Sequence, residues 1–231
     1  MSIGTKLCSL LRDLWRPGQD EQVTDFLILI MGIAGAGKSS FINAFDIVEG
    51  GPAKVGHTLQ PSTSDIRMHV IDLPNELASE FKGALDSRWV VLVDSPGFDT
   101  GAGDSKSLAQ ITKLVAKQYT RGVTLGSIVY MCDISVNRVN GAARVNVKQL
   151  EKMLGESNTF QRVVLVTAAW DEVRAEVGTQ REEELCLSFW KELIARGATV
   201  KQTWGLHSSD PSGHVEVLRH ILQSLGTSLT A

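Results

Sequence analysis

The chain has 231 residues, 43% of them hydrophobic, a formal net charge of −3 and an isoelectric point near 6.0. This composition supports a buried core of domain size, and the charge gives no electrostatic basis for a nucleic-acid partner. Three cysteines, Cys8, Cys132 and Cys186, are odd in number and far apart, so neither a disulfide framework nor a cysteine metal site is expected.

Membrane and export signals are not evident either. No apolar run approaches the roughly 18–20 residues of a membrane span, and the N-terminus lacks the continuous apolar segment of a signal peptide. We therefore expect no transmembrane span, a cytoplasmic location, and Cys132 and Cys186 as buried free thiols.

The first fifteen residues carry apolar side chains at helical spacing, and Arg16, Pro17 and Gly18 end that pattern. We predict an N-terminal amphipathic helix and connector over residues 1–20, followed by the main domain over residues 21–231. The helix either packs on the flank of that domain, contacts a partner, or lies weakly on a membrane surface.

Residues 32–39 match the phosphate-binding pattern G-x-x-x-x-G-K-[ST]. An apolar run over residues 26–31, within a strand predicted over residues 25–31, leads into them, and a helix-like segment that we extend to about Val48 follows. The motif predicts that Lys38 reaches the β- and γ-phosphates and that the Ser39 hydroxyl binds Mg²⁺. The residues expected to line the phosphates are Gly32, Ala34, Gly35, Ala36, Gly37, Lys38, Ser39 and Ser40. A chance glycine-rich turn is the alternative, which the strand–loop–helix context disfavours.

The next segments predict a loop over residues 53–64 and a strand over 66–73, in which Arg67 and His69 occupy the solvated face. Residues 74–86 are polar and are predicted to be turn-rich. A buried strand over 89–93 then ends in D-x-x-G, with Asp94 and Gly97 in the order that a GTPase needs. Asp94 is predicted to hold Mg²⁺ through water, and the Gly97 N–H to contact the γ-phosphate.

The rest of the chain alternates helices and strands. We predict helices over 107–120, 142–154, 182–196 and 213–225, and strands over 127–132, 163–167 and 198–203. This alternation is typical of an α/β fold: a three-layer P-loop NTPase, or G domain, with a mostly parallel central sheet and helices on both faces. Because ligands bind at the carboxyl ends of such strands, the phosphate loop, Asp94 and Asp171 should share one rim.

Base selection is assigned to Asp171, whose carboxylate can accept the guanine N1 and N2 hydrogens that adenine lacks. The lysine of the usual N/T-K-x-D motif is missing, because Ala168 and Ala169 precede Trp170. Trp170 or Thr167 is expected to compensate, and the alternative role of Asp171 is a helix N-cap.

A second Mg²⁺-binding hydroxyl is expected from the loop after the first helix. Thr58, Ser62, Thr63 and Ser64 are all candidates, and composition does not choose among them.

Taken together, these motifs resemble the septin-like branch of P-loop GTPases, which includes septins, the immunity-associated nucleotide-binding proteins and the chloroplast-import receptors. The nearest resemblance is to the G-domain proteins of mushroom-forming fungi, in seven sequence blocks between about residues 25 and 225. Those blocks are residues 32–43, 55–66, 93–99, 130–138, 166–173, 181–185 and 189–194.

The resemblance implies a guanine-nucleotide-binding protein that uses GTP, GDP and Mg²⁺, and it selects Thr63 as the switch-loop hydroxyl. It implies that the Trp170–Asp171 form of the base motif is normal for this group, and that a homodimer across the nucleotide face is possible. The chain departs from the group at Cys132 and Asp133, where His-Arg is usual. It also matches poorly around residues 201–209, which the resemblance implies to be the final base-contacting loop.

Phe98 cannot orient the attacking water for hydrolysis, because it occupies the position at which Ras-like proteins carry a glutamine. We predict slow intrinsic hydrolysis, or hydrolysis completed across a dimer by Arg121, Arg138 or His57. The alternatives are an assembly module with negligible catalysis and, less favoured by the D-x-x-G motif, a P-loop ATP-dependent kinase.

Overall fold

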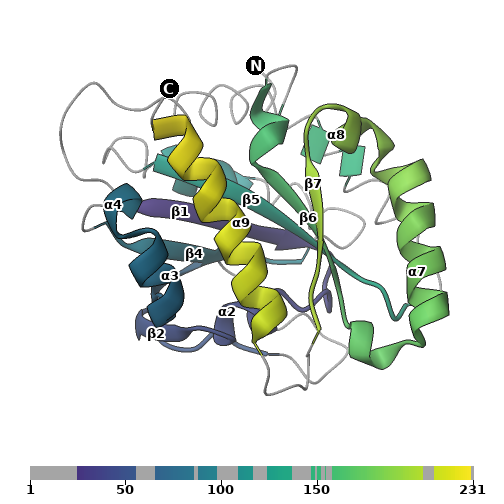
Figure 1. The fold of residues 1–231 in the computed structure, drawn as a ribbon, viewed down its shortest axis with the longest axis horizontal. Helices are drawn as coiled ribbons and strands as arrows, with labels where there is room; N and C mark the ends of the chain where they lie inside the picture. The colour runs from purple at the N-terminus through teal and green to yellow at the C-terminus, as the bar shows by residue number, and fades with distance from the viewer. Residues whose placement is uncertain are drawn as a thin grey trace.

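Figure 1 shows the computed structural model, which describes residues 25–55, 66–85, 88–97, 109–116, 124–136, 147–148, 150–151, 154, 158–204 and 211–229. The helix predicted over residues 1–20 lies outside these ranges. A seven-stranded sheet, in the order β2-β3-β4-β1-β5-β6-β7, forms the centre. Its strands are β1 (Phe26–Gly32), β2 (Asp46–Glu49), β3 (Arg67–Asp72), β4 (Val90–Asp94), β5 (Thr124–Asp133), β6 (Val163–Ala168) and β7 (Thr199–Gln202).

Most of the sheet is parallel. β1 pairs in parallel with β4 and β5, and the parallel run continues through β6 to β7. Only β3 reverses direction, because it is antiparallel to both β4 and β2. The predicted α/β architecture with a mostly parallel sheet is thus confirmed. The carboxyl ends of β1, β4, β5, β6 and β7 meet at one edge of the sheet, called the carboxyl rim below.

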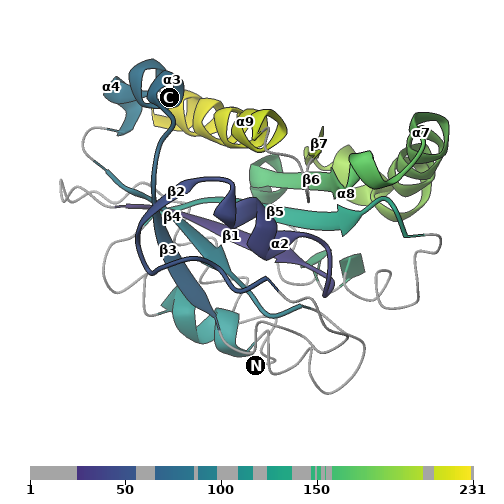
Figure 2. The same cartoon turned by 90° about the horizontal axis from the view of Figure 1, so that it is seen from below.

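Helices cover both faces of the sheet, as predicted (Figure 2). One face carries α2 (Lys38–Asn43), α3 (Asn75–Glu80), α4 (Lys82–Leu85) and α9 (Ser212–Leu229). The other carries the helical residues 109–116, the helical residues between 147 and 154, α7 (Ala175–Glu184), the π-helix η3 (Leu185–Phe189) and α8 (Lys191–Ala195). Short 3₁₀ helices are η1 (Asn158–Arg162) and η2 (Trp170–Glu172). None of the helices in the described part has the length and hydropathy to cross a membrane.

The central strand explains why two layers of helices are needed. β1 sends Leu27 and Leu29 into one hydrophobic cluster, and Phe26, Ile28 and Ile30 into the other. All seven residues of β1 are buried. A strand that is apolar on both faces must be covered on both faces, which is the arrangement of a parallel sheet in an α/β domain.

The predicted extension of the first helix to Val48 is wrong. α2 ends at Asn43, and residues 46–49 form the edge strand β2. The Asn43 side chain turns the chain back: its Nδ2 donates to the Ala53 carbonyl at 2.8 Å, and its Oδ1 accepts from the Ala53 N–H at 2.7 Å. The β-branched pair Ile47 and Val48 then suits an edge strand better than a helix.

The turn-rich prediction for residues 74–86 is also wrong, because α3 and α4 occupy that segment. Leu77, Phe81 and Leu85 recur every four residues and are buried together under α9. This spacing is that of one helix face. The polar residues between these positions concealed the pattern.

The helix predicted over 182–196 begins earlier and is interrupted. α7 starts at Ala175, and η3 separates it from α8. The sequence pattern did not indicate this start, because Gly178 disfavours a helix interior. Glycine is needed at this position, because a Cβ would lie 2.7 Å from the Trp170 ring. The predicted cap at Gly197 is confirmed, with φ of +105° and its N–H donating to the Ile194 carbonyl at 2.9 Å.

His69 differs from its predicted exposed position. It is fully buried on β3, and its Nδ1 donates to the Gly51 carbonyl at 2.7 Å. The cause is β2, which pairs outside β3 and brings the following loop over the imidazole. The strand itself is confirmed at Arg67–Asp72, but its polar face is covered at this point.

Candidate functional site

The carboxyl rim gathers the residues that the sequence assigned to one site. The phosphate loop follows β1, Asp94 ends β4, and Asp171 follows β6 within η2. Because β1 pairs directly with β4, the register places Ile30 opposite Asp94 and brings the loop beside that carboxylate.

The phosphate loop has the backbone that its glycines allow. Gly35 and Gly37 have φ of +80° and +85°, in the left-handed region where a side chain is strained. Gly32 lies so close to β5 that a Cβ would stand 2.3 Å from the Met131 carbonyl oxygen. A loop with this alternation of backbone conformations turns its N–H groups toward one side, where they form an anion-binding concavity.

Lys38 lies across this loop. Its ammonium donates to the Ile33 carbonyl at 2.7 Å and to the Gly32 carbonyl at 3.1 Å, and the residue is only 6% exposed. The two loop carbonyls hold the ammonium at a position where phosphate oxygens could complete its coordination. This placement agrees with the phosphate-binding role predicted for Lys38.

Ser39 and Asp94 meet although 55 residues separate them. The Ser39 hydroxyl donates to Asp94 Oδ2 at 3.0 Å, and Asp94 is fully buried at the end of β4. Ser95 fixes the same strand end, because its hydroxyl donates to the Ile30 carbonyl at 2.7 Å. A hydroxyl and a carboxylate thus face each other beside the phosphate loop.

These donors fit Mg²⁺ together with a nucleotide. In the described part of the chain, no group of three or more His, Cys, Asp or Glu residues could hold a metal by itself. Mg²⁺ takes oxygen ligands, keeps several waters and shares phosphate oxygens with a substrate. One hydroxyl and one buried carboxylate beside a phosphate loop are the protein ligands that such an ion needs.

Gly97 lies directly against the phosphate loop. A Cβ on Gly97 would stand 2.6 Å from the Ala34 N and 2.7 Å from its Cα. Only glycine therefore allows the end of the D-x-x-G segment to approach this closely. The contact places the Gly97 backbone on the loop, where the sequence predicted a sensor of the γ-phosphate.

The end of the site at which the sequence predicts base recognition is built around a strained turn. Ala169 has φ of +64°, the only positive φ of a non-glycine residue among those described. The turn directs Asp171 to the surface, at the start of η2. The residue that follows β5 holds the start of this turn, because the Ile134 N–H donates to the Ala168 carbonyl at 2.9 Å. A non-glycine residue in this region costs about 1 kcal/mol or more and persists where surrounding contacts enforce it.

A hydrogen-bond network that the sequence did not reveal supplies those contacts. The Trp170 Nε1–H donates to Thr167 Oγ1 at 2.9 Å, and that hydroxyl donates to Glu182 Oε1 at 2.7 Å. Glu182 Oε2 also accepts from Gln202 Nε2 at 2.6 Å. Thr167 is fully buried and Trp170 is 9% exposed, so the indole faces the core. The compensating contact with the base predicted for Trp170 stays a prediction.

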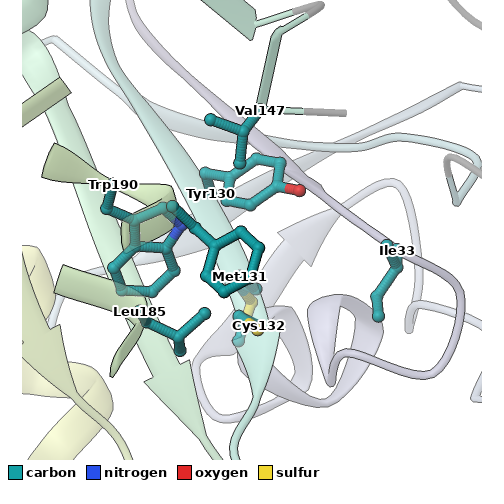
Figure 3. Close-up of a pocket in the computed structure, with 8 residues that line it drawn as sticks. Ile33, Tyr130, Met131, Cys132, Val147, Leu185 and Trp190 are labelled. Carbon is teal, nitrogen blue, oxygen red and sulfur yellow. The ribbon is translucent and has the colours of Figure 1, made fainter. Parts of the chain in front are cut away.

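A small apolar pocket lies behind the phosphate loop (Figure 3). Ile33 of the loop, Tyr130 and Cys132 of β5, and Leu185 and Trp190 of the opposite layer line it. Burial and, to a lesser degree, nearby Asp133 raise the pKa of the Cys132 thiol to about 12. The thiol is therefore neutral at physiological pH, and the pocket is part of the apolar packing behind the site.

Several predicted residues lie outside the described ranges. They are the switch-loop candidates Thr58, Ser62, Thr63 and Ser64, the residue Phe98, and the residues His57, Arg121 and Arg138 proposed to act in trans. Their roles stay predictions.

The fold and the site together define a P-loop nucleotide-binding protein of the GTPase class. Residues 27–168, well over half of the 231 residues, match the family described as 50S ribosome-binding GTPase, and the chain belongs to that family.

Solved structures show the same fold. Toc33 from Arabidopsis thaliana in complex with Mg²⁺ and GMPPNP is 15% identical, with a TM-score of 0.58 over 98% of this chain and 92% of that chain. A dimerization-deficient Toc33 mutant is 16% identical, with a TM-score of 0.61 and the same coverage of 98% and 92%. The bacterial selenocysteine-specific elongation factor EF-Sec is 16% identical, with a TM-score of 0.55, over 89% of this chain and 29% of that chain. No curated protein matches the sequence.

Proposed function

We propose that this protein binds GTP and GDP with Mg²⁺ and hydrolyses GTP slowly to GDP and phosphate. The observation that carries the proposal is the 3.0 Å contact between Ser39 and buried Asp94 beside the phosphate loop. Membership of a GTPase family supports it. The family description includes ribosome binding, but we do not propose that activity for this chain, because a net charge of −3 gives no electrostatic support for binding RNA.

Each residue has a distinct task in this proposal. The loop amides and the Lys38 ammonium bind the phosphates, and Ser39 and Asp94 hold the Mg²⁺ ion. The Gly97 N–H donates to the γ-phosphate. Mg²⁺ held by Ser39 and Asp94 would supply positive charge to the phosphate oxygens. The Asp171 carboxylate at the surface accepts from guanine N1 and N2, which gives selectivity over adenine.

Nucleotide titrations test the binding proposal. We expect micromolar or tighter binding of GDP and GTP in the presence of Mg²⁺, and much weaker binding of ATP. Ser39→Ala should weaken the Mg²⁺-dependent part of the affinity, while Ser79→Ala is the control, because that hydroxyl serves only the Asn75 carbonyl within α3. Preference for ATP would contradict the proposal and revive the kinase alternative.

Hydrolysis is proposed to be completed by a second copy of the chain. Phe98 cannot orient water, and Thr63 is our candidate for the switch-loop hydroxyl. The Toc33 and Toc159 translocon components are described as GTPases for whose activity dimerisation is important. Arg121, Arg138 and His57 are the candidates that would reach the partner's nucleotide.

Single-turnover GTP hydrolysis at increasing protein concentration tests the dimer. The rate constant should rise with concentration and level off as the dimer saturates, and Lys38→Ala should abolish it. A rate independent of concentration would remove the contribution in trans.

A second candidate function is an assembly module whose guanine nucleotide is structural. Phe98 favours it, because this position lacks the polar group that catalysis uses in Ras-like proteins. Tight GDP binding with no measurable turnover in either the monomer or the dimer would select this function.

The finer family placement belongs to the proposal as well. We assign the chain to the septin-like branch, nearest to the fungal G-domain proteins, with a G domain over residues 21–231 and an N-terminal helix before it. The cytoplasmic location stays a prediction from the sequence.

A further inference from the structure

An exposed indole lies on the carboxyl rim beside the base-recognition turn. Trp204 follows β7, and 48% of its surface is exposed. Such exposure is unusual for a large aromatic side chain. The indole lies within residues 201–209, where the sequence departs from the final base-contacting loop of the resembled group, and no role was predicted for it.

Backbone pairing fixes the position of Trp204. β6 and β7 pair in parallel with Thr167 opposite Gln202, and the Thr203 N–H donates to the Thr167 carbonyl at 2.9 Å. The chain therefore follows β6 beyond the end of β7. This continuation brings Trp204 level with Ala169, next to the turn that presents Asp171.

The indole is also supported from behind. Its ring centroid lies 6.5 Å from that of Trp170, at an angle of 43°. The first turn of α9 lies against it, because a Cβ on Gly213 would stand 3.2 Å from Trp204 Cε3. One part of the ring is held by the protein, and the remainder faces solvent at the rim.

The three described residues just before Asp171 offer no exposed surface on which a planar ring could lie. Ala168 and Ala169 are 3% and 1% exposed and have no stem to cover a base. Trp170 is turned inward and uses its N–H on Thr167. Among the described residues at the ends of β6 and β7, Trp204 is the exposed aromatic side chain.

We propose that the guanine ring stacks on Trp204, which takes the place of the missing lysine stem, while Asp171 reads the edge of the base. This inference rests on the proposed function. Stacking acts on the face of a base and does not distinguish one purine from another. Trp204 would therefore supply affinity, and Asp171 selectivity.

Calorimetric titration of GDP and IDP in the presence of Mg²⁺ tests the assignment. Trp204→Ala should weaken both nucleotides about tenfold or more, as expected for the loss of one stacking contact, and leave their affinity ratio unchanged. Trp204→Phe should recover most of the affinity. Trp89→Ala is the matched control, because Trp89 is 52% exposed but precedes β4, at the opposite edge of the sheet.

A second measurement does not depend on the alanine variant being folded. GDP should protect tryptophan fluorescence of the wild-type protein from acrylamide, and Trp204→Phe should lose that protection. Wild-type affinity in Trp204→Ala, or unchanged protection in Trp204→Phe, would overturn the assignment. A change of oligomeric mass with GDP affinity intact would also overturn it, and would place Trp204 in a contact between copies. Failure of the wild-type protein to bind GDP would instead overturn the proposed function.

Discussion

Replacement of Thr167 by valine isolates the network that holds the base-recognition turn. Valine has nearly the same shape, so Thr167→Val removes the hydroxyl and leaves the packing of β6 in place. The Trp170 Nε1–H then loses its acceptor at 2.9 Å, and Glu182 loses the donor at 2.7 Å. The two losses are unequal, because Glu182 is half-buried and keeps Gln202 at 2.6 Å, whereas Trp170 is buried.

The cost follows from these two environments. A buried indole N–H without an acceptor costs about 1–3 kcal/mol, and a hydrogen bond lost by a partly solvated carboxylate about 1 kcal/mol. We therefore expect Thr167→Val to lower the free energy of unfolding by about 2–4 kcal/mol, a substantial part of the stability of a domain. Nucleotide affinity should fall as well, because the turn that carries Asp171 loses its support.

Urea denaturation followed by circular dichroism measures this change. Thr167→Ser is the control, because it keeps the hydroxyl and loses one buried methyl group, at a cost of about 1 kcal/mol. In the Trp170→Phe variant there is no indole N–H that could lose its acceptor. Thr167→Val should therefore lower the free energy of unfolding by about 1–2 kcal/mol less in that variant than in the wild type. Equal stability of the valine and serine variants, or strict additivity in the double mutant, would refute the account of the network.

Three other predictions follow from single contacts. Gly97→Ala should displace the phosphate loop, lower stability by about 1–3 kcal/mol and weaken GTP binding in a titration, whereas Gly83→Ala, with nothing within 4 Å of its added Cβ, should not. Burial, followed by nearby Lys201, lowers the pKa of His220. Its unfolded form therefore binds protons more readily, so urea midpoints should fall below about pH 6.5 and fall less in His220→Gln. Arg219→Ala, which breaks the contacts of α9 with two glutamates of α3 at 3.0 and 3.2 Å, should cost about 1 kcal/mol at low salt and less at 0.5 M NaCl.

The phosphate end of the site could be predicted because its information is local. The loop motif names Lys38 and Ser39 within eight consecutive residues, and an apolar strand points to Asp94. The rule that parallel strands share a carboxyl edge then brings the two segments together. The structure then adds the 3.0 Å contact between Ser39 and Asp94, which the sequence did not predict.

The errors in the fold arose where local patterns were weak. The four-residue spacing of Leu77, Phe81 and Leu85 is a helical signal, but the polar composition of the segment favoured turns. The extent of α2 could not be found in this way, because Asn43 ends it through contacts with Ala53, ten residues along the chain.

The sequence predicted Asp171 at the base end of the site, but it did not predict the contacts that hold this end. Its conformation depends on partners 15 and 20 residues apart in sequence, such as Thr167 with Glu182 and Glu182 with Gln202. The left-handed Ala169 is unfavourable locally and exists only because the surrounding contacts enforce it. Under the proposed function, the site that reads the guanine base without the usual lysine is held by these tertiary contacts. If so, substitutions at this end should change stability and nucleotide affinity together, whereas Lys38→Ala at the phosphate end should change affinity with little effect on the fold.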